Sequence, residues 1–111
     1  MTRRDLLRGG AALALLPFAG RSFAAAPARE HVIPIAAMRF GAVPAGIKAG
    51  DTILWVNRDI VPHTATARDR SFDVTVQPRQ SARVTLGRAG TFAFFCRFHP
   101  AMQGVLRVAA H

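Results

Sequence analysis

The sequence contains one cysteine, few acidic residues and no long apolar run. Its 111 residues include a single Cys and only six Asp and Glu, and the apolar stretch at 9–20 has 12 residues. One cysteine excludes an intramolecular disulfide. A helix of about 12 residues is too short to span the bilayer core of roughly 30 Å. The length excludes multidomain oxidases, kinases and large α/β barrels. Because half of the residues are hydrophobic, the chain is not a disordered tail, and we expect one folded domain.

Positive charge exceeds negative charge throughout the sequence. Fifteen Lys and Arg stand against six Asp and Glu, which gives a formal net charge of +9. Residues 1–24 hold four arginines and one aspartate, so 11 basic and five acidic residues, a net charge of +6, remain in 25–111. A basic surface attracts nucleic acid, anionic membranes or acidic protein patches. It can equally be a solvated face that has no partner.

The first 26 residues have the order of a secretory signal peptide. A charged start leads into the apolar stretch, and small residues follow it. Arg3 and Arg4, followed by two leucines, resemble a twin-arginine export signal. An ordinary Sec signal and an uncleaved membrane anchor are the alternatives. We expect cleavage after Ala24, with a signal peptide at 1–24 and a mature domain at 25–111 that has no membrane span. If the mature domain is exported, we expect it in the periplasm, where nucleic acid is excluded as a partner.

The remainder of the sequence has the pattern of an all-β protein. From residue 25 onward, turn residues recur every 8–12 positions between short runs rich in Val, Ile, Thr and Phe, which is typical of a sandwich or barrel. No window long enough for a helix has helical periodicity without a Gly or Pro inside it. Pro34 cannot donate a ladder hydrogen bond, so we expect its strand at an edge or with a bulge there. The predicted strands are 30–38, 46–48, 52–57, 63–67, 72–76, 81–86, 91–96 and 104–109.

Four residues have the side chains of a soft-metal site. Cys96, His99 and Met102 fall within seven residues, at the end of one predicted strand and in the loop before the next. His63 begins another strand. Two His, one Cys and a weak axial Met are the ligands of a blue-copper electron-transfer site. Thiolate and thioether favour Cu(I), and imidazole suits both oxidation states, so such a site rearranges little when an electron arrives or leaves.

Three stretches of the sequence resemble small type 1 copper proteins, the cupredoxins of the plastocyanin and amicyanin group. They are residues 50–57, 61–64 and 90–104, in the order of the family. The gap of two residues between His99 and Met102 is similar to the short loop of amicyanin. The resemblance implies a Greek-key β-sandwich of about seven to eight strands, and one type 1 copper bound by His63, Cys96, His99 and Met102.

The sequence departs from the family pattern near the first histidine. Thr64 stands where the family often has an Asn that helps to pin the ligand loop, so we expect weaker pinning here. The stretch from His63 to Cys96 is shorter than in amicyanin, and the neighbourhood of Phe72 and Asp73 lacks the Ser-Gly that commonly follows. These departures weaken the assignment to amicyanin itself and leave the expected copper site unchanged.

Each of the four residues also has a purely structural interpretation. Alone, Cys96 is most simply a buried core thiol and Met102 a core side chain, and His63 is a strand histidine. A nucleophilic Cys96–His99 pair lacks an orienting acid and an oxyanion hole. Structural zinc is unattractive because a thioether is a poor zinc ligand. Among the remaining candidates, we expect His31 on the surface of a strand, His111 at a solvated terminus, and Met38 and Trp55 in the core.

The expected function is one-electron transfer by a copper ion that alternates between Cu(I) and Cu(II). Phe98, Pro100 and Ala101 would form an apolar collar around His99, together with Pro62, where redox partners dock transiently. We expect a monomer whose partners are c-type cytochromes or a periplasmic dehydrogenase, oxidase or reductase. The alternative is copper binding for storage, delivery or resistance. An enzyme would need a second copper centre, and that centre is usually supplied by histidines at the positions of Phe95 and Arg97.

Overall fold

The computed structural model describes residues 27–111, so the predicted signal peptide at 1–24 lies outside the described residues. The described residues form nine strands and no helix. The described part of the chain therefore contains no helix that is long and apolar enough to cross a membrane. The strands are β1 (Glu30–Ala36), β2 (Arg39–Phe40), β3 (Ile47–Lys48), β4 (Thr52–Asn57), β5 (His63–Ala67), β6 (Asp73–Val76), β7 (Ser81–Thr85), β8 (Gly90–Phe95) and β9 (Gln103–Ala109).

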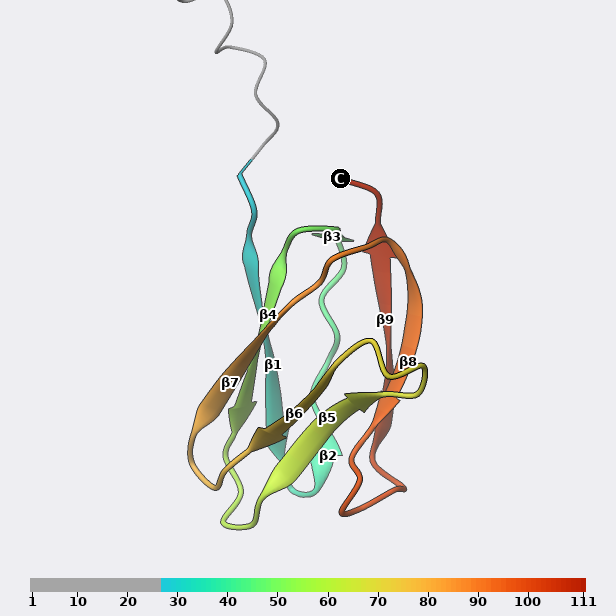
Figure 1. Cartoon of the computed structure of the whole chain (residues 1–111). Coiled ribbons are helices and arrows are strands. Elements are labelled where there is room, and N and C mark those ends of the chain that lie inside the picture. The colour runs from blue at the N-terminus through green and yellow to red at the C-terminus, as the bar shows by residue number, and fades with distance from the viewer. Residues whose placement is uncertain (1–26) are drawn as a thin grey trace, which may run out of the picture.

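The strands form two sheets that pack face to face. One sheet has the order β2-β1-β4-β7 and the other β3-β9-β8-β5-β6. β1 pairs in parallel with β4, and β8 pairs antiparallel with both β5 and β9. Figure 1 shows the turn between β1 and β2, the start of β5 and the loop between β8 and β9 at the same end of the sandwich. The predicted all-β sandwich is confirmed.

The core is formed by alternate residues of the strands, those whose side chains face inward between the two sheets. In β4, Ile53, Trp55 and Asn57 are buried while the residues between them are half-buried, as expected for a strand with one face on the core. Trp55 packs edge-on against Phe94 of β8, with ring centroids 5.1 Å apart. In β9, Gly104 pairs with Phe94, and a Cβ at this glycine would collide with the phenyl ring. A glycine is therefore required where the loop before β9 rejoins the sheet.

One strand was absent from the prediction, and one predicted strand ends early. β1 stops at Ala36, and β2 returns after a two-residue turn made by Ala37 and Met38. Both turn residues have positive φ, 52° and 60°, as a type I′ hairpin turn requires. This conformation costs roughly 1–2 kcal/mol per residue for a side chain larger than Gly. The sequence Ala-Met contains no turn signal, so it was assigned to the strand.

The prediction for Pro34 needs a correction. β1 is neither an edge strand nor bulged, because it lies between β2 and β4. The carbonyl of Pro34 accepts a hydrogen bond from the Gly41 N–H at 2.7 Å, just beyond the short strand β2. The N–H and C=O of one strand residue point to the same side, so the proline nitrogen also faces β2. Proline is tolerated here because the ladder to β2 has already ended.

Two further predictions about single residues were wrong. His31 is not a surface residue: its side chain is 9% exposed, and its Nε2 lies 2.8 Å from the Asp51 carboxylate. Met38 is not in the core, since it is 42% exposed on the turn after β1. Trp55 is fully buried and His111 is exposed, as expected.

Candidate metal centre

Strand pairing brings the four predicted ligands to one end of the sandwich. His63 is the first residue of β5, and Cys96 directly follows β8. Because β5 and β8 are antiparallel neighbours, the start of one lies beside the end of the other. His99 and Met102 belong to the loop that connects β8 to β9. The site therefore combines a residue from a strand with three residues from one short loop.

The side chains of His63, Cys96 and His99 lie close together, and the loop that carries Cys96, His99 and Met102 is closed by hydrogen bonds. The Cys96 Sγ lies 3.8 Å from the His63 Nδ1, and the rings of His63 and His99 have centroids 5.2 Å apart. The Cys96 N–H donates to the carbonyl of Met102 at 3.1 Å, and the Met102 N–H donates to the carbonyl of His99 at 2.9 Å. These bonds fix the loop as a tight turn beside β5.

Asp59 determines which nitrogen of His63 is available to a metal. Its carboxylate lies 2.8 Å from the His63 Nε2, so this nitrogen is the donor and Nδ1, which faces the cysteine sulfur, keeps its lone pair. Asp59 also accepts hydrogen bonds from the backbone N–H groups of Ala37 and Met38, at 2.8 and 3.0 Å. Burial alone would raise the pKa of Asp59, but the hydrogen bonds from Met38, His63 and Ala37 hold this pKa below its usual value. The carboxylate is ionised and can orient the ring.

Thr64 holds both the thiolate and the ligand loop. Its backbone N–H points at the Cys96 Sγ at 3.3 Å, and its hydroxyl oxygen accepts a hydrogen bond from the Arg97 N–H at 2.8 Å. The hydroxyl also bonds to Thr66 at 3.0 Å, and Thr66 donates to Asp73 at 2.8 Å. The weak pinning expected for Thr in place of Asn is therefore not seen, because the threonine hydroxyl reaches the loop backbone directly.

These donors fit a soft metal ion. The Sγ of Cys96 and the Nδ1 of His63 face one another in a dry place, since both residues are fully buried. His99 is half-buried and Met102 is 5% exposed. One thiolate, two imidazoles and one thioether form the donor set of a mononuclear type 1 copper site. Among residues 27–111, no three His, Cys, Asp or Glu side chains, His63, Cys96 and His99 included, are gathered closely enough to hold a metal ion by themselves, so the copper site is inferred from the types of donor present.

The residues of the predicted apolar collar are exposed, and Arg39 and Gln103 line the same cavity as His99. Phe98, Pro100, Ala101 and Pro62 are all exposed. Ile60 is 77% exposed and belongs to the loop between β4 and β5, which leads to His63. Sequence reasoning missed Ile60, Asp59 and Met38, although an Asp four residues before a candidate histidine ligand is a signal that could have indicated the contact between Asp59 and His63.

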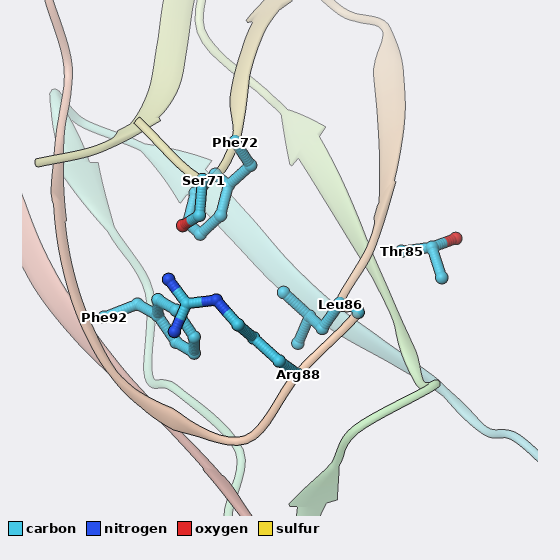
Figure 2. A pocket seen from close by; sticks show the side chains of 7 residues that line it. Ser71, Phe72, Thr85, Leu86, Arg88 and Phe92 are labelled. Carbon is cyan, nitrogen blue, oxygen red and sulfur yellow. The ribbon is translucent and has the colours of Figure 1, made fainter. Parts of the chain in front are cut away.

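The pocket in Figure 2 lies away from these ligands, near the start of β8. Its walls are Phe72, Leu86 and Phe92, with a volume of about 310 Å³. The guanidinium of Arg88 lies over the ring of Phe92 at 4.9 Å and pairs with Asp69 at 3.0 Å. The lining contains two hydroxyls, those of Ser71 and Thr85, but no thiol, carboxylate or imidazole. The chemistry of the described residues is therefore concentrated at the other end of β8.

Comparison with known proteins assigns the chain to a family. A family model described as a cupredoxin-like domain matches residues 10–108, so the chain belongs to the cupredoxin-like family. It is 31% identical to amicyanin from Paracoccus versutus over 84 residues, 70% of this chain and 64% of that protein, which is less than two thirds of the relative's length. It is 30% identical to amicyanin from Paracoccus denitrificans over 90 residues, 74% of this chain and 69% of that protein.

Solved structures agree with this assignment. The crystal structure of amicyanin from Paracoccus versutus matches with a TM-score of 0.61 and 29% identity, covering 78% of this chain and 86% of that chain. A Cu(I) form of a mutant amicyanin matches with a TM-score of 0.62 and 29% identity, covering 78% and 87%. The predicted membership of the cupredoxins and the predicted similarity to amicyanin are confirmed.

Proposed function

We propose that the chain binds one copper ion through His63, Cys96, His99 and Met102 and carries single electrons, without catalysing a reaction of its own. The observation that carries the proposal is the pair formed by the Cys96 Sγ and the His63 Nδ1, 3.8 Å apart, with the other nitrogen of His63 tied to Asp59. A ring held in this way is already oriented for a metal. Copper supplies the one-electron redox couple, and its amicyanin relatives, one of them solved in a Cu(I) form, support this choice.

The protein's contribution is a site that keeps its geometry and excludes water. Hydrogen bonds with Thr64, Met102 and Asp59 hold the ligand residues before any metal arrives. Cys96 and His63 are inaccessible to water, whereas His99 reaches the surface inside the apolar collar. The edge of His99 is then the shortest route for an electron, and the collar allows a partner to approach closely and leave again.

The distribution of charge supports an acidic partner. Each of the five carboxylates in residues 27–111 has a cationic or imidazole neighbour: Glu30 with Arg83, Asp51 with His31, Asp59 with His63, Asp69 with Arg88 and Asp73 with Arg97. The surplus arginines are therefore not neutralised locally. Arg68 and Arg70, together with the paired Arg97, line one surface pocket around Phe95, the residue that precedes Cys96 in the chain. Such a surface steers acidic proteins towards the copper end at low ionic strength.

We propose that the mature domain works in the periplasm as a monomer. The signal-like order of residues 1–24 supports export, and the paired Arg3 and Arg4 favour the twin-arginine route. c-type cytochromes and periplasmic dehydrogenases, oxidases or reductases are the classes of partner that fit this location.

Electron-transfer rates with small redox reagents test the proposal. The reduced protein should be oxidised by an anionic reagent, hexacyanoferrate(III), at a rate that falls as salt is added. Oxidation by a cationic reagent, tris(phenanthroline)cobalt(III), should become faster under the same conditions. Replacing Arg68 and Arg70 by Gln should reduce both salt effects and leave the copper content unchanged. Storage or delivery would be supported instead if a chelator removes the copper on each redox cycle, or if the bound Cu(I) is not oxidised within minutes.

A further inference from the structure

The side chain of Met38 is presented to solvent at a conformational cost. Met38 and Ala37 form the two-residue turn between β1 and β2, and both have positive φ. Asn and Gly are the residues that favour this turn. A larger residue kept in such a conformation at an exposed position suggests a function for its side chain. Residues 25–111 contain only one other methionine, the predicted ligand Met102.

The turn that carries Met38 is fixed to the candidate metal centre. The carboxylate of Asp59 accepts the N–H groups of Ala37 and Met38 and also contacts the Nε2 of His63. One side chain therefore sets the position of the exposed methionine and the orientation of a buried histidine. These bonds anchor the backbone of the turn that carries Met38 to the carboxylate that contacts His63.

A surface cavity connects Met38 with two of the four predicted ligands. The cavity has a volume of about 460 Å³, and Met38, His99 and Met102 are among its lining residues. Cys96 and His63 are both 0% exposed, so a metal ion must pass other residues to reach them, and the cavity lined by His99 and Met102 offers one route. The cavity is open on this side, and Met38, 42% exposed, is its most accessible soft donor.

We propose that Met38 is an entry ligand through which Cu(I) reaches the proposed copper centre. This inference rests on the proposed function. The thioether binds the incoming ion at the cavity, where a soft donor selects Cu(I) over harder cations. The ion then exchanges Met38 for His99 and Met102 and moves on to Cys96 and His63. Each step is a ligand exchange without electron transfer, and the Cys96 thiol releases its proton to solvent when the Cu–S bond forms.

Copper uptake by the metal-free mature protein tests this proposal. Cu(I) is supplied as its coloured bicinchoninate complex, and the fall in absorbance gives the rate of transfer to the protein. Met38→Leu keeps the size of the side chain and removes the sulfur. We expect roughly tenfold slower uptake for this variant, since a single soft ligand is lost at the point of entry. The final copper content, optical spectrum and reduction potential should equal those of the native protein. Ile60→Leu, an exposed apolar change at the same end, should load at the native rate.

Uptake by Met38→Leu at the native rate, with a native final spectrum, overturns the entry site and leaves the copper centre intact. A missing copper spectrum in the native protein contradicts the proposed centre instead. If Met38→Leu does not fold, a titration of the native Cu(I)-loaded protein with Ag(I), a redox-inert soft ion, decides the question by NMR. The methyl signal of Met38 should shift on addition of Ag(I), and a signal that stays in place refutes the proposal.

Discussion

The backbone N–H of Thr64 lies 3.3 Å from the sulfur of Cys96, while the hydroxyl of the same threonine accepts the Arg97 N–H at 2.8 Å. Thr64 is fully buried. One residue of β5 therefore contacts the cysteine sulfur and fixes the first peptide of the ligand loop. The backbone donor to the sulfur is independent of the side chain at position 64.

Thr64→Val should loosen the loop and leave the donor to the sulfur in place. Valine has nearly the shape of threonine, but it leaves the Arg97 N–H without an acceptor, at a cost of about 1–3 kcal/mol in the free energy of unfolding. Hydrogen exchange of the Arg97 amide should become faster. Thr64→Ser is the matched control, because it keeps the hydroxyl and should keep the amide protected. Unchanged protection in Thr64→Val would show that another group holds the loop.

Met102→Gln should retain a copper site and lower its reduction potential. An amide oxygen is a harder donor than a thioether, so it favours Cu(II) over Cu(I). For one electron, a tenfold change in the relative affinities corresponds to about 59 mV, and we expect a decrease of at least that size in voltammetry. A potential equal to that of the native protein would mean that Met102 only fills space and that another group lies on the axis.

Acid should destabilise the fold through Asp51. The hydrogen bond from His31, followed by those from the backbone N–H groups of Arg29 and Lys48, holds the pKa of Asp51 far below its usual value. A carboxyl whose pKa is lower in the folded chain stabilises the fold above its unfolded pKa, near 3.9, and loses this contribution as pH falls further. The Asp51→Asn variant should therefore be less stable than the native protein at pH 7. Below about pH 4 it should lose less stability than the native protein does. Urea midpoints from about pH 7 to 2.5 measure this. Parallel curves for the two proteins would contradict the role of Asp51.

The sequence predicts most of the sandwich because its strands alternate. In 81–86 the side chains of Ala82, Val84 and Leu86 are buried or half-buried, and those between them are exposed, as the period of two requires. β2 escaped prediction because its turn is Ala-Met, which has positive φ and donates its N–H groups to Asp59 from another part of the chain. The residues next to this turn in the sequence do not indicate its contact with Asp59.

The ligands of the candidate site were predictable, but the residues that support them were not. Cys96, His99 and Met102 lie in one short motif, and their side-chain chemistry is distinctive. Asp59 and Thr64 have ordinary side chains, and their roles depend on which atoms they face after folding. His31 was misplaced for the same reason, since its partner Asp51 lies 20 residues away in the sequence.

Export should depend on the arginine pair at the N-terminus. Replacing Arg3 and Arg4 together by Lys keeps the charge and removes the twin-arginine feature. We expect the precursor of this variant to stay in the cytoplasm, as measured by fractionation and immunoblotting. Replacing Arg8 by Lys is the matched control and should not impair export. Normal periplasmic accumulation of the double variant would indicate a Sec signal.

The optical spectrum of the Cu(II)-loaded mature protein tests the central claim most directly. A short bond between copper and the Cys96 thiolate predicts strong charge-transfer absorption near roughly 600 nm. Cys96→Ser should lose this band and bind copper weakly, because a hydroxyl is not a soft ligand. A protein that takes up copper without the band, or a Cys96→Ser variant that keeps it, would contradict the assignment of His63, Cys96, His99 and Met102 as a type 1 copper centre.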